Sequence, residues 1–446
     1  MNILNIKSGH TRSQNIKKNV IASFIFKGIS IGISLLLVPM TLNYLDKERY
    51  GLWLTLSSVI SWFSLFDIGL GNGFRNKFAE ALAVKNVSLA RIYVSTTFAL
   101  LSIIIGIVLI IFFLVNPFLD WRAILNTTIE NHGELSLLAI IVFTFFCLQF
   151  VFKLVTSVLL ADQKPALVDL INMLGSLLSL FIIYILIHVS EGSLLLLGLT
   201  LSVCPVLVLI LSYFVMFTGK YRIYKPGLQY IDFKQSKGLM GLGFLFFIPQ
   251  MAGLVVFSTS NVLIAQIFTP SDVTVYNIAF KYFSLITLFF QIILVPFWSA
   301  FTEAFVKQDI IWIKNAMHKL ILFWGISCLA AIVMVMASDF FYKLWVGNQI
   351  KIPIQVSVSL AIYVCIGNWN NIFTSFNIGV SKVFIQVWLS LFGGIIFIPL
   401  AILLSRNIGL IGIPIAMGLS ILLGSFIVPI QYNKLVNRVA DGIWNK

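Results

Sequence analysis

Long apolar runs recur along the whole chain and leave little room for any other kind of structure. About 20 consecutive apolar residues form an α-helix that crosses the hydrocarbon core of a bilayer. Such a helix satisfies its own backbone hydrogen bonds, as the lipid environment requires. The predicted spans are residues 20–44, 51–70, 94–115, 137–160, 168–189, 193–217, 239–267, 275–301, 317–337, 353–376, 384–405 and 409–431.

The composition agrees with a chain built of membrane-spanning helices. Hydrophobic residues make up 59% of the sequence and charged residues only 10%, whereas soluble proteins carry about 25% charged residues. A soluble chain this apolar could not cover its surface with polar groups. We therefore predict an all-α polytopic membrane protein with about 12 transmembrane helices, an even number that puts both termini on one side.

The basic residues predict which side that is. Of the 30 lysines and arginines, twenty-one fall in segments on the side of the termini, six on the other side and three within spans. Cytoplasmic loops carry the excess of positive charge in membrane proteins, so we expect both termini in the cytoplasm. This distribution explains the net charge of +14 without a nucleic-acid partner.

Two halves of the chain share landmarks in the same order. Residues 78–81 read FAEA and residues 301–304 read FTEA, and short polar turns follow at 162–165 and 380–383. Each half then holds six spans and enters the membrane from the same side, which predicts two six-helix lobes related by a parallel internal repeat. Transporters use such repeats to move two bundles about a central site.

A basic segment, residues 218–237, separates the two predicted lobes, which are residues 1–217 and 238–446. Cationic segments next to membrane spans bind anionic lipid headgroups. We expect this linker to lie on the cytoplasmic membrane surface; the alternative is a binding surface for a cytoplasmic partner.

One stretch near the N-terminus resembles a known family. Residues 50–53 read YGLW and residues 66–82 read FDIGLGNGFRNKFAEAL. This stretch, with the span count and the six-plus-six repeat, resembles the polysaccharide branch of the multidrug/oligosaccharidyl-lipid/polysaccharide exporter superfamily, and within it the O-antigen flippases (Wzx-type). The resemblance implies that undecaprenyl-pyrophosphate-linked oligosaccharide crosses from the cytoplasmic to the periplasmic leaflet of a bacterial inner membrane, through a central cavity between two lobes.

Three lysines lie inside predicted spans, and we expect them to bind substrate as cations of the cavity. They are Lys27, Lys153 and Lys281. Ionisable groups at membrane depth usually face a cavity or a partner, and a diphosphate leaving the headgroup region needs positive charge. The alternative is that each lysine extends its ammonium group to the membrane interface.

Four residues near cytoplasmic helix ends are candidates for gating or ion coupling. Asp67 precedes a glycine-rich segment and Arg75, while Glu80 and Glu303 occupy matching positions in the FAEA and FTEA motifs. The alternative role is structural, with Asp67 paired to Arg75 or to free backbone amides, and with the two glutamates in ion pairs with nearby lysines.

Several functional classes lack their motifs. The sequence has no Walker A motif, no G-x-S-x-G or H-E-x-x-H motif and no paired His, Cys and carboxylate spacing typical of a metal site. We expect a transporter, not an enzyme, with no cofactor or metal. Its expected partners are the lipid-linked oligosaccharide, membrane lipids and other polysaccharide-assembly proteins. The alternatives are a multidrug exporter of the same superfamily, whose cationic substrates three intramembrane lysines would repel, and a glycan polymerase.

Overall fold

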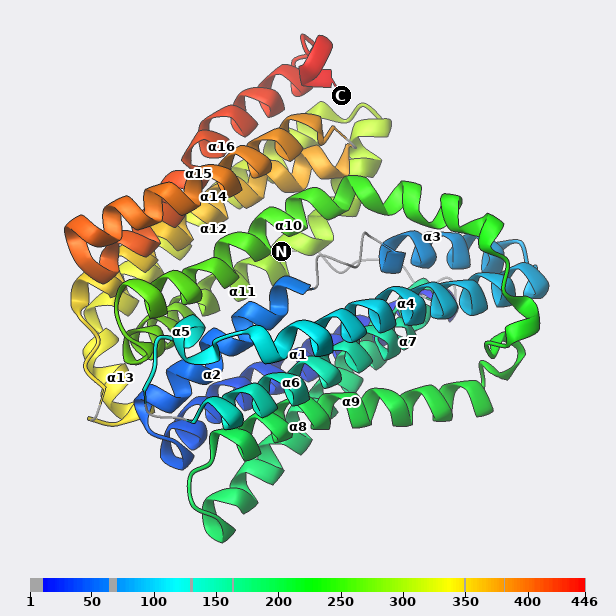
Figure 1. The fold of residues 1–446 in the computed structure, drawn as a ribbon. Helices are drawn as coiled ribbons and strands as arrows, with labels where there is room; N and C mark the ends of the chain where they lie inside the picture. Colours follow the sequence, from blue (N-terminus) through cyan, green and yellow to red (C-terminus); the bar gives the residue numbers. More distant parts are fainter. Residues whose placement is uncertain are drawn as a thin grey trace. The chain divides into compact units, whose positions relative to one another are not determined.

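The structure is a computed structural model in which the regular elements of the described residues are all helical (Figure 1). The described residues are 11–63, 70–128, 131–162, 164–348, 350–380 and 382–445. The α-helices are α1 Thr11–Tyr44, α2 Lys47–Ser61, α3 Leu70–Ala83, α4 Val87–Val115, α5 Trp121–Leu125, α6 His132–Phe152, α7 Leu154–Ala161, α8 Pro165–Val189, α9 Leu194–Thr218, α10 Ser236–Ile267, α11 Pro270–Val306, α12 Ile310–Met336, α13 Ser338–Val346, α14 Ile354–Gly379, α15 Phe384–Ile408 and α16 Gly412–Val436.

Nine stretches of the described chain are long and apolar enough to cross a membrane. The last of them, Phe384–Val436, contains both α15 and α16, and α10 adds the shorter apolar helix Gly253–Ile267. Each of the twelve predicted spans overlaps one of the helices. The prediction of an all-α, multi-pass membrane protein is confirmed.

The helices form two compact units. The first comprises residues 1–45, 64–121 and 130–244, and the second comprises residues 46–63, 122–129 and 245–446. Helix α2 thus belongs with the second unit. The lobe boundaries expected from the sequence, with a linker at 218–237, stay a prediction.

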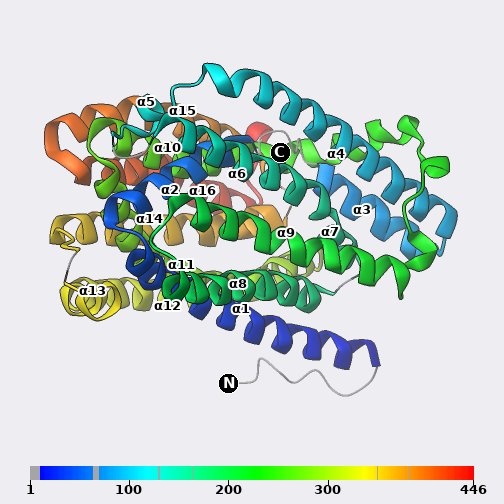
Figure 2. The same cartoon turned by 60° about the horizontal axis from the view of Figure 1, so that its bottom comes forward.

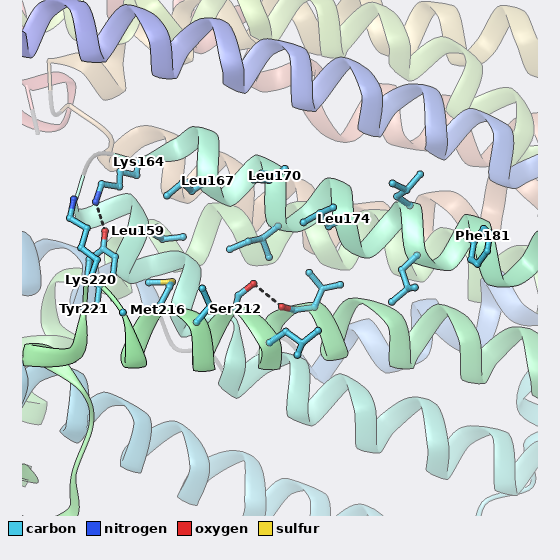
Figure 3. A pocket seen from close by; sticks show the side chains of 17 residues that line it. Leu159, Lys164, Leu167, Leu170, Leu174, Phe181, Ser212, Met216, Lys220 and Tyr221 are labelled. Atoms are coloured by element: carbon cyan, nitrogen blue, oxygen red, sulfur yellow. Dashed lines mark hydrogen bonds between the residues drawn. The ribbon is translucent and has the colours of Figure 1, made fainter.

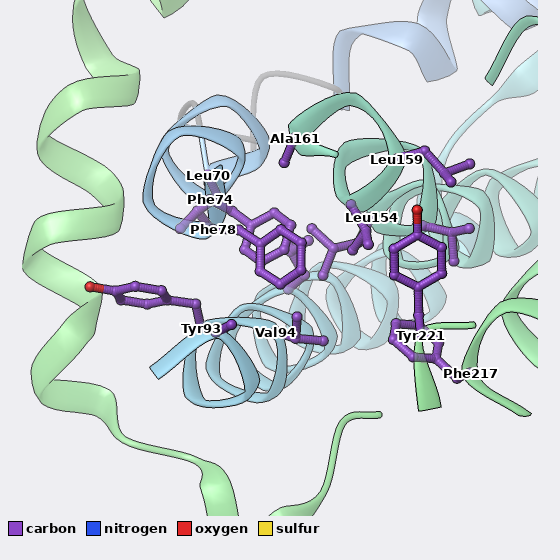
Figure 4. Close-up of a cluster of buried hydrophobic side chains, with 14 of the residues drawn as sticks. Leu70, Phe74, Phe78, Tyr93, Val94, Leu154, Leu159, Ala161, Phe217 and Tyr221 are labelled. Carbon is purple, nitrogen blue, oxygen red and sulfur yellow. The ribbon is translucent and has the colours of Figure 1, made fainter. Parts of the chain in front are cut away.

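In the first unit, α1 packs along α8, and α6 packs along α9 (Figure 2). An aromatic and aliphatic cluster closes one end of this bundle, where α3, α4, α7 and α9 meet (Figure 4). Phe74 and Phe78, one turn apart on α3, stack with their centroids 5.3 Å apart. Phe78 also meets the edge of Tyr224 at 5.5 Å, so the cluster holds the segment after α9 as well as the helices.

That segment runs over three short 3₁₀ helices, Arg222–Tyr224, Leu228–Tyr230 and Phe233–Gln235. It is attached to α4 through several contacts. The Arg91 side chain donates to the carbonyl oxygen of Lys225 at 2.9 Å, and its guanidinium lies 3.9 Å from the ring centre of Tyr230. The amide of Asp232 donates to the Thr96 hydroxyl at 2.9 Å. Its backbone is therefore held against the first unit.

In the second unit, α14 packs against α11, α12 and α16, and α15 packs along α16. Glycine permits the closest approaches. A Cβ atom added at Gly393 of α15 would lie 2.6 Å from the carbonyl oxygen of Ser420 on α16. One added at Gly51 of α2 would overlap the carbonyl oxygen of Pro270, at the start of α11. Neither position has room for a side chain without backbone movement.

Candidate functional site

An uncharged cavity of about 280 Å³ lies within the second unit, among α10, α11, α14, α15 and α16. Aromatic rings, amides, hydroxyls and glycines line it, and none of the lining side chains carries a formal charge. The lining residues are Gly253, Val256, Phe257, Phe280, Tyr363, Asn370, Thr374, Gln386, Leu389, Ser390, Gly393, Gly394, Met417, Ser420, Ile421, Gly424 and Val428.

Two amides in this cavity have unmet hydrogen-bonding capacity. The Oδ1 atom of Asn370 and the Oε1 atom of Gln386 are buried and accept no hydrogen bond from any residue that the structure describes. An unsatisfied buried acceptor costs about 1–3 kcal/mol, and a ligand with hydroxyl donors would remove that cost. A lining with amides and hydroxyls but no formal charge suits a neutral polyhydroxyl compound.

Three aromatic rings form a wall beside the amides. Phe257 and Phe280 lie with centroids 5.1 Å apart, and Phe280 and Tyr363 with centroids 6.5 Å apart. The faces of such rings carry partial negative charge, which attracts the weakly positive C–H groups of an apolar sugar face. Binding sites commonly combine such apolar walls with a few convergent polar groups.

Small residues open the space that the amides face. A Cβ atom at Gly424 would lie 3.3 Å from the amide nitrogen of Asn370, so a larger side chain there would crowd this amide. At Gly253, no atom of the described residues lies within 4 Å of an added Cβ atom. Side chains at these two positions would reduce the cavity.

A second group of polar side chains in the same unit is hydrogen-bonded internally. Asn261 donates to the Ser58 hydroxyl at 2.8 Å, and Asn277 donates to Asn261 Oδ1 at 2.8 Å. The hydroxyls of Ser61 and Ser258 lie 2.6 Å apart. Because these groups satisfy one another, they join α2, α10 and α11, and we assign them a structural role.

The three lysines expected in the cavity lie in different environments. Lys27 lies on α1 with its Nζ atom 3.9 Å from Asp169 Oδ2 of α8, and its side chain is 57% exposed. The Ser23 hydroxyl donates to the same carboxylate oxygen. A partner 142 positions away in the sequence thus joins α1 to α8.

Lys153 lies at the junction between α6 and α7, where the helix is interrupted, and its side chain is exposed. Its carbonyl oxygen accepts a hydrogen bond from the Thr156 hydroxyl at 2.6 Å. Lys281 lies on α11 of the second unit, is partly buried, and follows the cavity residue Phe280 in sequence. The first unit therefore holds Lys27 and Lys153, and the second holds Lys281.

The expected gating residues are only partly described. Asp67 and the side chain of Glu303 lie outside the described residues. Arg75 is exposed on α3. Glu80 accepts a hydrogen bond from Lys77 at 2.7 Å, which raises the pKa of the Lys77 ammonium group. This contact is the ion pair that the alternative, structural role of Glu80 requires.

The sequence did not reveal a polar cluster at the turn between α7 and α8. The Tyr221 hydroxyl donates to Asp162 Oδ2 at 2.6 Å and accepts from Lys164 Nζ at 2.7 Å, and Lys164 also pairs with Asp162. Burial opposes ionisation of Asp162, but the hydrogen bonds from Lys164 and Tyr221 outweigh it and lower the pKa of its carboxyl. Burial lowers the pKa of the Lys164 ammonium group.

Comparisons with known proteins support the resemblance seen in the sequence. No protein-family model matches the chain. A Salmonella typhi protein with the provisional name O-antigen transporter is 25% identical over 364 residues, which cover 79% of this chain and 80% of that protein. A Yersinia pseudotuberculosis protein with the provisional name O-antigen export protein is 22% identical and covers 81% and 82%, respectively.

Solved structures of transporters resemble this fold. An inward-facing multidrug resistance MATE family transporter of the MOP superfamily superposes with a TM-score of 0.75 at 14% identity, over 94% of this chain and 98% of that one. A mutant of a Vibrio cholerae MATE transporter superposes with a TM-score of 0.63 at 11% identity, over 97% and 100%.

The fold and the sequence relatives thus define one class, the polytopic membrane transporters, and the chain is not an enzyme. The names of these relatives give no support to the alternative of a glycan polymerase. Within that class, the chain resembles proteins named as an O-antigen transporter and an O-antigen export protein, as the stretch at residues 50–82 predicted.

Proposed function

We propose that this protein translocates undecaprenyl-pyrophosphate-linked oligosaccharide, an O-antigen repeat unit, from the cytoplasmic to the periplasmic leaflet of a bacterial inner membrane by alternating access. The observation that carries the proposal is the uncharged cavity of the second unit. There the amide oxygens of Asn370 and Gln386 accept no hydrogen bond from the described residues, and three aromatic rings line the same cavity. The names of the curated relatives support the same substrate class.

The two ends of such a substrate need different chemistry. Sugar hydroxyls would bind the amides of Asn370 and Gln386. Lys27, Lys153 and Lys281 would steer the pyrophosphate, because attraction between charges strengthens where the dielectric constant is low. The lipid chain would stay in the bilayer.

Asp67, Arg75, Glu80 and Glu303 would act in gating or ion coupling near the cytoplasmic surface, where both termini and the basic segment 218–237 lie in this proposal. Other polysaccharide-assembly proteins would meet the transporter on that side.

The first experiment is deletion of the gene, with assay of surface polysaccharide and of the leaflet in which lipid-linked intermediates accumulate. Loss of surface glycan with full-length units on the cytoplasmic face is the expected result. Unchanged surface glycan would overturn the proposal.

Complementation then tests the lysines. The triple variant Lys27→Ala, Lys153→Ala and Lys281→Ala should restore little surface glycan when it is expressed at the normal level. The matched control removes three exposed lysines outside the predicted cavity, Lys225, Lys343 and Lys351, and should restore the glycan. Full activity of the first variant would refute the steering role.

Multidrug export is the second candidate, because the solved structures of the same fold include multidrug transporters and because the cavity has aromatic walls. It predicts that the deletion strain becomes sensitive to cationic drugs and keeps its surface glycan. The drug susceptibility of that strain therefore separates the two functions.

A further inference from the structure

A second cavity, of about 990 Å³, forms a long apolar groove between α8 and α9 of the first unit. Leu167, Leu170, Leu174 and Phe181 line it at spacings of three, four and seven residues, which puts them on one face of α8. Apart from Tyr221 at one end, the lining residues include one hydroxyl, that of Ser212 on α9, which already donates to the Val208 carbonyl oxygen at 2.7 Å. Between its two ends the groove therefore offers apolar contacts.

The groove has a cationic mouth. Lys164, Lys220 and Tyr221 lie at one end, and Phe181 lies at the other (Figure 3). The Lys164 side chain is only 20% exposed, and its contacts with Asp162 and the Tyr221 hydroxyl fix its position. The two lysines outweigh Asp162 by one positive charge, so this end attracts an anion.

The groove is longer than one leaflet is deep. Leu167 and Phe181 are fourteen residues apart on one helix, which corresponds to about 21 Å of helix length. Half of the hydrocarbon core is about 15 Å thick. A phospholipid anchored at the lysines would leave the far part of the groove to other lipids, whereas a polyprenyl chain is long enough to fill all of it.

We propose that this groove binds a polyprenyl phosphate, with the phosphate at Lys164 and Lys220 and the isoprenoid chain along α8. The inference rests on the proposed function and deepens it, since it assigns a site to the lipid part of the substrate. A chain held past the bilayer midplane need not leave the groove while its headgroup changes leaflet.

Binding of undecaprenyl phosphate to the purified full-length protein in detergent tests this site, with native mass spectrometry as the readout. Lys220→Gln removes a mouth cation and should weaken binding about fivefold, the loss expected for one lysine at a lipid surface. Leu174→Trp fills the groove at a position that is already 41% exposed, and should weaken binding at least as much.

Matched controls remove the same chemistry elsewhere. Lys225→Gln removes an exposed lysine of the neighbouring segment, and Leu148→Trp enlarges a leucine of α6 that is 37% exposed; neither residue lines the groove. Both variants should bind as the unaltered protein does, and thermal unfolding should show all four variants folded.

Three results would overturn the inference. Displacement of undecaprenyl phosphate by phosphatidylglycerol at equal concentration would make this an ordinary anionic-lipid site. A polyprenol without phosphate that binds equally well would deny the lysines a role, and equal binding by the groove and control variants would place the ligand elsewhere. Because binding is measured without transport, failure here is distinct from failure of the proposed function, which the leaflet assay detects.

Discussion

Replacing Asn370 by leucine should make the protein more stable and less active. Leucine has the same number of side-chain heavy atoms as asparagine, branched at the same carbon, but no polar atoms, so the change removes the buried Oδ1 atom that has no partner among the described residues. Relief of one unsatisfied acceptor is worth about 1 kcal/mol or more. Because the entropy of unfolding grows with chain length and this chain has 446 residues, each kcal/mol raises the melting temperature by about 1 °C. Loss of one hydrogen bond to the sugar should weaken substrate binding about fivefold.

Asn368 supplies the matched control. It lies two positions away on α14, is 1% exposed, and both of its amide atoms lack partners among the described residues, but it does not line the cavity. Asn368→Leu should therefore stabilise the protein by about 2 kcal/mol, which is about 1 kcal/mol for each of the two unsatisfied amide atoms. The same change should leave transport unchanged.

The assay combines thermal unfolding of both purified variants with surface glycan measured at matched expression. The reasoning requires that both variants gain stability and that only Asn370→Leu loses glycan. If Asn370→Leu unfolds at a lower temperature than the unaltered protein, its amide has a structural partner. If both variants lose glycan equally, a residue that lines the cavity matters no more than one that does not, and the cavity is not the sugar site.

Three further changes test the packing and the turn cluster. Gly393→Ala should cost about 1–3 kcal/mol, because its Cβ atom would lie 2.6 Å from the Ser420 carbonyl oxygen; an unaltered melting temperature would show that α15 shifts freely. Tyr221→Phe should cost about 1–3 kcal/mol in thermal unfolding, since its hydroxyl bonds both Lys164 and Asp162; no change would mean that water replaces it. The pKa of the Asp162 carboxyl is lowered, so its contribution to stability is fully present above pH about 4, the value of a free carboxyl, and is lost as the pH falls further. Melting temperatures across this range should fall more steeply for the unaltered protein than for Asp162→Asn, and parallel curves would contradict the assignment.

Hydropathy alone was enough to predict the long apolar helices, but not the short helices α3, α5 and α13. Each predicted span overlaps a helix. A long apolar run in a bilayer forms an α-helix because this conformation satisfies all backbone hydrogen bonds within one segment. Finer features depend on contacts between distant segments. The interruption of the helix at Lys153 involves neither proline nor glycine, so no local rule predicts it.

The candidate site was harder to predict. The residues predicted from the sequence are charged, whereas the polar residues that line the cavity are neutral amides and hydroxyls. The stretch at 367–371 reads GNWNN inside a predicted span, and polar groups at membrane depth are costly enough to suggest function. That pattern could have identified Asn370. The sequence could not have predicted that Asn370 and Gln386 line the same cavity, since the two amides come from different helices. The pairing of Lys27 with Asp169 depends likewise on how α1 meets α8.

The backbone of the basic segment after α9 is already fixed in the folded protein, and this affects how strongly the segment can bind an anionic membrane surface. A flexible basic loop that settles on an anionic membrane must give up backbone freedom, at about 1–2 kcal/mol for each residue that becomes fixed. Here the contacts of Arg91 with Lys225 and Tyr230, and of Thr96 with Asp232, already fix the backbone, while the side chains of Arg222 and Lys225 remain exposed. The backbone is ordered during folding, so these cations form a preorganised patch that can bind an anionic surface without a further loss of backbone entropy.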